Sequence, residues 1–187
     1  MTNAQEGVFK WGNTQTPYCF YPAKKGKRTV VFINGLVQSY RHWHMYQEVL
    51  AKEGIGSLAY MLPGQVDAPL ISETPRYIDF SEHVLALCEH LSVETIYLTG
   101  LSLGAGLALY TSIFFSDRIQ GLMTFSAYSR TTNHMESIHR GIMQAAQDAD
   151  LSRFYDLLTV VNFKPNFVIE KDELLAKSRD RIEQTYN

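Results

Sequence analysis

The chain alternates between two spacings of hydrophobic residues. Continuous apolar runs of strand length occur at 29–36, 55–62, 95–100 and 118–128, and two shorter ones lie at 7–12 and 16–23. Between them, at 39–54, 77–91 and 102–115, apolar residues recur at the spacing of a helix that buries one side. We therefore predict strands at the continuous runs and helices at the periodic segments.

Strands that alternate with helices predict an α/β fold, in which a mostly parallel sheet is covered by helices on both faces. The two opening strands predict a hairpin or meander, and we interpret the basic run "KKGKR" at 24–28 as a solvated hairpin turn. Ligands of parallel sheets bind at the carboxyl ends of the strands. We therefore expect the functional residues at the carboxyl ends of the predicted strands.

The chain changes character after residue 128. Strand-like runs give way to three helical patterns, at 134–149, 151–163 and 170–184. We predict two parts, a core over residues 1–128 and a helical segment over residues 129–187.

The 187 residues carry a formal net charge of −2, which gives no reason to expect nucleic acid or an anionic membrane as partner. No apolar run reaches the length of a membrane span and no signal-peptide pattern opens the chain, so we expect a cytoplasmic protein. Cys19 and Cys88 lie far apart in apolar contexts, which favours buried thiols over a disulfide or a metal site. We expect no cofactor and no metal.

The stretch Gly100-Leu101-Ser102-Leu103-Gly104 has the pattern G-x-S-x-G, with a predicted strand before it and a predicted helix after it. Such a turn strains the serine backbone, and glycine is needed two positions to either side because a side chain there would collide with neighbouring backbone. The strain presents the hydroxyl at a helix N-terminus, whose dipole favours developing negative charge. This context favours a nucleophile over the alternative, a serine in an ordinary Gly-Ser turn.

With "GLSLGAG" at 100–106 and the first strand–helix–strand crossover, the sequence resembles the α/β-hydrolase superfamily from about residue 29 to residue 163. The resemblance implies that Ser102 attacks a carbonyl carbon and that residues 129–187 form the helical cap that members of this family insert. Three cap residues are candidates for lining an acyl chain or, equally, for packing the cap: Met143, Phe154 and Tyr155.

The same resemblance implies an oxyanion hole. Members of the family usually have a His-Gly pair after the third strand, and this chain has Asn34-Gly35 there. The implied donors are the backbone N–H groups of Leu36 and Leu103, which a change from His to Asn need not remove.

A serine hydroxyl needs a base, and in this family an acid and then a histidine follow the serine, after later strands that these 187 residues do not contain. We therefore expect the proton acceptor of Ser102 to lie on a C-terminal segment or a partner chain. Nearer alternatives are His134 and His139, which follow the last predicted strand. The other histidines are interpreted as surface or pocket-lining groups (His42, His44) or as members of a polar helix face (His83, His90).

The leading hypothesis is a serine hydrolase that cleaves an ester or thioester through an acyl-Ser102 intermediate. Two alternatives stay open: a catalytically impaired binding or assembly subunit, and an acyltransferase that uses the same serine. The last predicted strand, near 122–126, has an apolar edge without a neighbour. Because such an edge pairs readily with another chain, we also expect a homo-oligomer or a complementing C-terminal chain.

Overall fold

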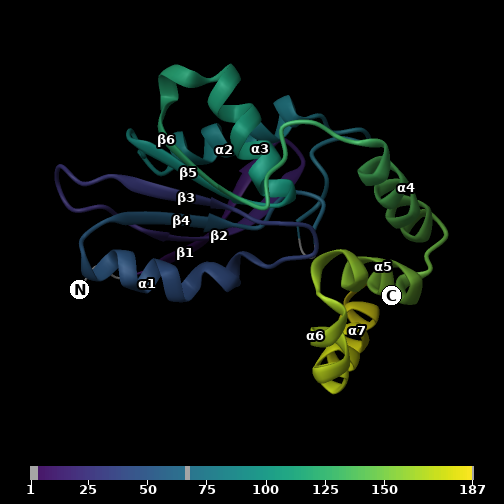
Figure 1. Ribbon diagram of the computed structural model, residues 1–187. Helices are drawn as coiled ribbons and strands as arrows, with labels where there is room; N and C mark the ends of the chain where they lie inside the picture. Colours follow the sequence, from purple (N-terminus) through teal and green to yellow (C-terminus); the bar gives the residue numbers. More distant parts are fainter. Residues whose placement is uncertain (1–3, 66–67, 187) are drawn as a thin grey trace. The chain divides into compact units, whose positions relative to one another are not determined.

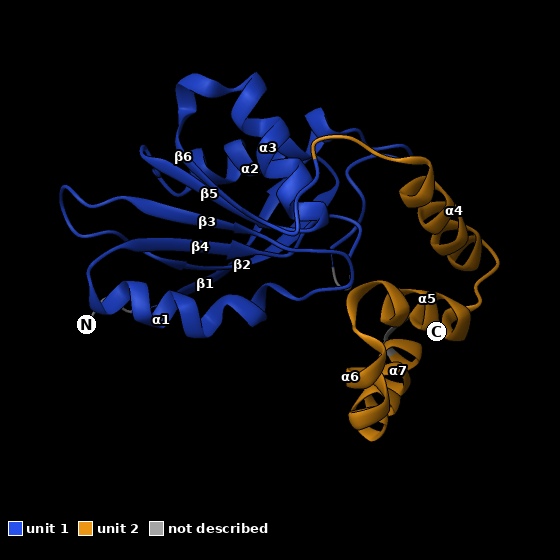
Figure 2. Cartoon of the chain, in the orientation of Figure 1, with its two compact units in different colours: residues 1–128 blue, residues 129–187 orange. Residues whose placement is uncertain are grey.

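The computed structural model of the protein describes residues 4–65 and 68–186 (Figure 1). The chain divides into two compact units, Met1–Tyr128 and Ser129–Asn187, which Figure 2 colours blue and orange. Unit 1 carries the sheet, and the described part of unit 2 contains helices and their connections.

Unit 1 is built on one six-stranded sheet with the strand order β1-β2-β4-β3-β5-β6. The pairs β1–β2 and β2–β4 are antiparallel, whereas β4–β3, β3–β5 and β5–β6 are parallel. The strands are β1 Gln5–Trp11, β2 Thr14–Tyr21, β3 Thr29–Ile33, β4 Gly56–Tyr60, β5 Ile96–Leu101 and β6 Ile119–Phe125. The predicted fold class, α/β with a mostly parallel sheet, is confirmed.

Helices cover both faces of this sheet, with α1 on one face and α2 and α3 on the other (Figure 1). Alternation along β3 explains the two layers: Val31 and Ile33 enter the core beneath α2 and α3, whereas Phe32 enters the core beneath α1. The helical elements are η1 Tyr40–Trp43, α1 His44–Lys52, α2 Tyr77–His90, α3 Leu103–Phe114 and η2 Ser116–Arg118.

The basic run at 24–28 is not a hairpin turn. It contains an exposed turn with Gly26 at a φ of 77°, as predicted, but the strands on either side of it do not pair. β4 lies between β2 and β3 and pairs with both. In a hairpin, β3 would lie next to β2. Here β4, which comes later in the chain, lies next to β2 instead.

His83 corrects the interpretation of α2. Its side chain is fully buried, and its Nε2 lies 2.9 Å from the hydroxyl oxygen of Thr16 on β2. Burial lowers the pKa of His83 to about 4, so the imidazole is neutral at physiological pH. The residue lies three positions after Phe80 and four before Leu87, on the apolar side of the helix. His90, by contrast, is exposed as predicted.

Unit 2 consists of α4 Asn133–Gln147, α5 Leu151–Asn162, α6 Pro165–Glu170 and α7 Asp172–Tyr186. Phe154 and Tyr155 are buried within it, and the Tyr155 hydroxyl donates a 2.7 Å hydrogen bond to the carbonyl of Leu175. Met143 is exposed. These contacts give Phe154 and Tyr155 a packing role inside the unit. Among the described residues, none of the helices has the length and apolar character that crossing a membrane requires.

Candidate active site

Ser102 is the single residue between a strand and a helix, because β5 ends at Leu101 and α3 begins at Leu103. Its φ of 53° and ψ of −113° lie in a region that costs a non-glycine residue about 1–3 kcal/mol. Its backbone N–H donates a 2.9 Å hydrogen bond to the carbonyl of Phe125, and its carbonyl accepts bonds from the first turn of α3. The residue is exposed, and its hydroxyl has no hydrogen-bond partner among the described residues. The strained turn therefore exposes a hydroxyl that makes no hydrogen bond to the described residues.

Gly100 and Gly104 permit this turn. A Cβ on Gly100 would lie 2.1 Å from the carbonyl oxygen of Gly104. A Cβ on Gly104 would lie 2.3 Å from the carbonyl oxygen of Ile33 and 2.5 Å from that of Asn34. These are backbone atoms that cannot rotate aside. The contacts of Gly104 also show that the N-terminus of α3 lies directly against the carboxyl end of β3.

Asn34 fixes the loop that follows β3. It is fully buried, its Nδ2 donates a 3.1 Å bond to the carbonyl of Tyr60, and its Oδ1 accepts a 2.8 Å bond from Nε1 of Trp43. The side-chain amide of Asn34 is therefore occupied on both sides. Asn34 thereby ties the β3 loop to β4 and to Trp43, the last residue of η1.

The two N–H groups predicted to bind an oxyanion lie in adjacent segments. Leu103 is the first residue of α3, so its N–H belongs to the helix end that lacks intrahelical partners. Leu36 is 40% exposed, and within the described residues its N–H makes no hydrogen bond. A Cβ on Gly35 would lie 3.3 Å from the carbonyl oxygen of Leu101, which shows how closely the β3 loop approaches the serine turn.

Two glutamines that sequence reasoning missed hold this loop in place. The N–H of Gly35 donates a 2.9 Å bond to Oε1 of Gln38, and Nε2 of Gln65 donates a 3.2 Å bond to the carbonyl of Gly35. The N–H of Gln38 in turn donates to Oε1 of Gln65 at 3.2 Å. The available signal was positional, because Gln65 directly follows Pro63-Gly64 at the carboxyl end of β4.

The histidines predicted as local bases lie on α4. His134 is exposed and His139 is half-buried there, and both belong to unit 2, whereas Ser102 belongs to unit 1. Within the described part of unit 1, Ser102 lies with the predicted glycines and N–H groups but has no histidine partner. His83, the most deeply buried of the histidines in that unit, is held by Thr16.

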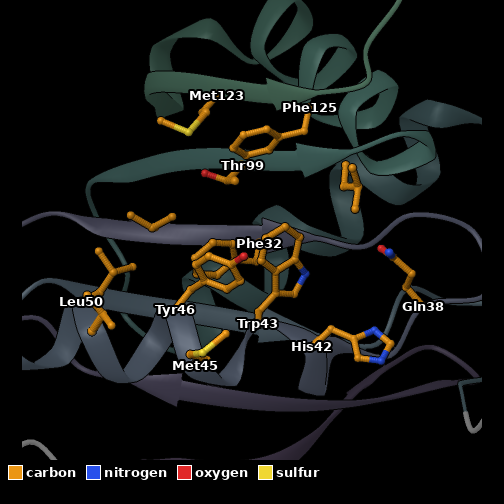
Figure 3. A pocket seen from close by; sticks show the side chains of 13 residues that line it. Phe32, Gln38, His42, Trp43, Met45, Tyr46, Leu50, Thr99, Met123 and Phe125 are labelled. Atoms are coloured by element: carbon orange, nitrogen blue, oxygen red, sulfur yellow. The ribbon is translucent and has the colours of Figure 1, made fainter. Parts of the chain in front are cut away.

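An open apolar groove with a volume of about 770 Å³ lies on the α1 face of the sheet, beside β5 and β6 (Figure 3). Tyr46 and Val49, which the helical pattern places on the apolar side of α1, are 53% and 57% exposed in it. The groove is lined by Val30, Phe32, Gln38, His42, Trp43, Met45, Tyr46, Val49, Leu50, Thr99, Leu101, Met123 and Phe125.

β6 is the edge strand next to the groove. It pairs with β5 on one side only within the described sheet. The side chains of Leu122, Met123 and Phe125 are 41%, 57% and 47% exposed. The strand therefore combines free backbone groups with apolar side chains, as the sequence predicted for this segment.

The parallel sheet, its two helical layers and the strained serine between β5 and α3 define an α/β hydrolase. The sequence profile of the family described as "alpha/beta hydrolase fold" matches residues 28–171, which is more than half of the chain. The protein belongs to this family, and the resemblance found in the sequence is confirmed. No curated protein matches the sequence.

Solved structures share this fold at low identity. MGS-M2, an alpha/beta hydrolase enzyme from a Medee basin deep-sea metagenome library, is 19% identical with a TM-score of 0.85 over 96% of this chain. A hydrolase from Pseudomonas aeruginosa is 18% identical with a TM-score of 0.68 over 97% of this chain. The thioesterase domain of the curacin biosynthetic pathway is 18% identical with a TM-score of 0.60 over 74% of this chain. This chain spans 66%, 66% and 52% of those three chains respectively.

Proposed function

We propose that this protein is a serine hydrolase that cleaves an ester or a thioester through an acyl-Ser102 intermediate. The observation that carries the proposal is the backbone of Ser102, which has a φ of 53° at the start of α3 and an exposed side chain. Glycine would adopt this conformation without strain, so a purely structural turn has no need for serine here. The combination of this φ with a ψ of −113°, outside the ordinary left-handed helical region, supports a role for the hydroxyl of Ser102.

In the proposed reaction, Oγ of Ser102 attacks the carbonyl carbon of the substrate while a general base takes the hydroxyl proton. The N–H groups of Leu36 and Leu103 donate to the oxyanion, beside a helix N-terminus that favours negative charge. Collapse of the tetrahedral intermediate breaks the bond to the leaving alcohol or thiol, which receives the proton from the base. Water then attacks the acyl-serine by the same route and releases the carboxylic acid.

The proposal assigns the base and its orienting acid to a C-terminal segment or to a partner chain. Two observations support this assignment. Ser102 has no histidine partner in the described part of unit 1, and Phe125, whose carbonyl holds the Ser102 N–H, ends an edge strand that can accept another strand. A strand added there would end close to the serine turn. The alternative within the chain is His134 or His139 of α4.

Turnover of short-chain nitrophenyl esters and acyl thioesters by the purified chain tests the proposal. Wild type is expected to hydrolyse one of the two classes faster than Ser102→Ala, and imidazole in solution is expected to raise the wild-type rate because it supplies the base. Equal rates for wild type and Ser102→Ala, with imidazole present, would contradict an acyl-serine route. Loss of activity in His134→Ala or His139→Ala, restored by imidazole, would assign the base to α4.

A second candidate, a non-catalytic binding or assembly subunit, is favoured by the groove of about 770 Å³ and by the lack of a histidine partner for Ser102 in the described part of unit 1. It predicts that Ser102→Ala leaves every measurable property except stability unchanged. Acyl transfer to an alcohol or amine uses the same acyl-serine, and product analysis with an added alcohol separates it from hydrolysis.

A further inference from the structure

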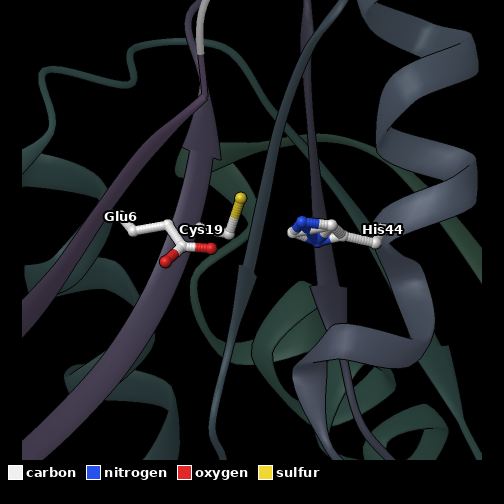
Figure 4. Close-up of side chains that lie close together, drawn as sticks. All are labelled: Glu6, Cys19 and His44. Atoms are coloured by element: carbon white, nitrogen blue, oxygen red, sulfur yellow. The ribbon is translucent and has the colours of Figure 1, made fainter.

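Three potential metal ligands from three elements lie together on the side of the sheet that α1 covers (Figure 4). Glu6 is on β1, Cys19 is directly opposite it on β2, and His44 is the first residue of α1. One carboxylate oxygen, the sulfur and one ring nitrogen all lie within 4.8 Å of one another. Directly opposed residues of an antiparallel pair project from the same face, so β1 and β2 hold two of the groups in register.

The cluster contains a buried thiol and a buried ring nitrogen. Cys19 is fully buried and forms no disulfide. Nδ1 of His44 is buried and has no hydrogen-bond partner in the described part of the chain. A buried polar atom without a partner costs about 1–3 kcal/mol, and a ligand bound at Nδ1 of His44 would remove this cost.

We propose that Glu6, Cys19 and His44 bind one Zn²⁺ ion. Thiolate, imidazole and carboxylate are the three ligand types that zinc takes in proteins, with water as a fourth ligand. Bond lengths of about 2.0–2.3 Å place tetrahedral ligands about 3.3–3.7 Å apart, so the groups must close by about 1 Å. Glu6 is exposed and its side chain can make this movement. Zinc displaces the thiol proton of Cys19, which is released to solvent.

The surroundings support a fixed site. Gln47 of α1 is fully buried, and its Nε2 donates a 3.1 Å hydrogen bond to the carbonyl of Cys19. This bond holds the helix that carries His44 against the strand that carries Cys19. The competing cation is Arg41, whose guanidinium nitrogen lies 3.9 Å from Oε1 of Glu6 at the protein surface. Zinc binding requires the Glu6 carboxylate to turn from Arg41 toward the thiol.

The proposed ion links the opening hairpin to α1 and stands apart from the serine turn. β1 and β2 occupy one end of the strand order, whereas β5, which leads to Ser102, lies next to the edge strand at the other end. The site is therefore structural, and it revises the expectation of no metal. Glu6, Cys19 and His44 lie too far apart in the chain to form a metal-binding sequence motif, so the cluster could not be predicted from spacing.

Titration of the chelator-treated 187-residue chain with Co²⁺ and then Zn²⁺ tests the site. We expect one equivalent of Co²⁺ to produce a thiolate-to-cobalt charge-transfer band that Zn²⁺ abolishes by displacement. At a free zinc concentration of about one hundred times Kd, the Tm is expected to rise by about 5–10 °C. Absence of the charge-transfer band, with circular dichroism showing a folded chain, would overturn the proposal.

Matched variants locate the ligands. Cys19→Ala is expected to abolish the band, and Cys88→Ala, which truncates the other buried thiol, to retain it. His44→Gln and Glu6→Gln are expected to weaken binding by at least about tenfold, whereas His42→Gln leaves it unchanged. Arg41→Gln is expected to tighten binding because it removes the competing cation. The proposal would be contradicted if Glu6→Gln bound metal as tightly as wild type and Cys19→Ala kept the charge-transfer band. The metal would then be bound elsewhere.

Discussion

The backbone N–H of Ser102 donates a 2.9 Å hydrogen bond to the carbonyl oxygen of Phe125, the last residue of β6. The serine turn is thereby attached to the edge strand of the sheet. The conformation of the serine and the order of that edge are coupled through this bond. A chain that pairs with β6 would act on the serine turn through the same strand.

The strain at Ser102 predicts a difference between two substitutions that both remove the hydroxyl. Ser102→Gly is expected to be more stable than Ser102→Ala by about 1 kcal/mol, because glycine adopts a φ of 53° without a Cβ penalty. The lower entropy cost of folding alanine offsets part of this gain. Urea denaturation of both variants measures the difference, and a more stable alanine variant would contradict a strained turn.

The close approach of backbone at Gly104 predicts a large loss of stability in Gly104→Ala. The new Cβ would lie 2.3 Å from the carbonyl oxygen of Ile33, and overpacking against backbone costs about 1–3 kcal/mol or more. Gly141→Ala is the control, since its Cβ would lie 3.6 Å from Leu157 and alanine favours the helix. Denaturant midpoints should fall for the first variant and rise for the second. Equal midpoints would mean that α3 does not abut β3.

Buried His83 predicts a loss of stability in mild acid. Its pKa is about 4 in the folded state and about 6.5 when unfolded, so the unfolded chain binds the extra proton first as the pH falls. Its contribution is complete above pH 6.5 and is lost between pH 6.5 and 4, at up to about 1.4 kcal/mol per pH unit. His83→Gln should flatten the pH profile of unfolding free energy in this window. The exposed control His90→Gln should not, and an unchanged profile in His83→Gln would contradict burial of a neutral imidazole.

The apolar edge of β6 predicts self-association. Sedimentation velocity of wild type should show a concentration-dependent dimer, and Met123→Lys should weaken it by at least about tenfold because a charge on the edge opposes strand pairing. Val8→Lys is matched to it, since Val8 is 53% exposed on β1, the strand at the other edge. A wild-type monomer over the whole concentration range would contradict pairing between copies through β6.

Local patterns predicted most of the fold. Each continuous apolar run contains a strand and each periodic segment contains a helix, because burial on two faces and burial on one side produce different spacings. The misread hairpin at 24–28 shows the limit. The insertion of β4 between β2 and β3 is a tertiary choice, and a turn with Gly26 at positive φ looks the same in either arrangement.

Part of the candidate active site could also be predicted from the sequence, because some of its contacts are local. Gly100 follows from a contact with Gly104 four residues later, which a pentapeptide can encode, whereas Gly104 is also required by the backbone of Ile33, which is distant in the sequence. Gln65 bonds to Gln38 and Gly35, which are 27 and 30 positions away, and its place after Pro63-Gly64 indicates the edge of the sheet but not these partners. The burial of His83 could have been predicted, because it lies at helical spacing from Phe80 and Leu87. We assigned His83 to the polar face of the helix because its side chain is polar.

Fluorophosphonate labelling followed by peptide mapping tests the proposed role of Ser102 most directly. Ser126 is the internal reference, because it is also exposed, has a φ of 55° and follows the neighbouring strand β6. With imidazole present, we expect Ser102 to be labelled at least about tenfold faster than Ser126, and labelling to disappear in Ser102→Ala but persist in Ser126→Ala. Equal and slow labelling of the two serines would contradict an activated nucleophile at position 102.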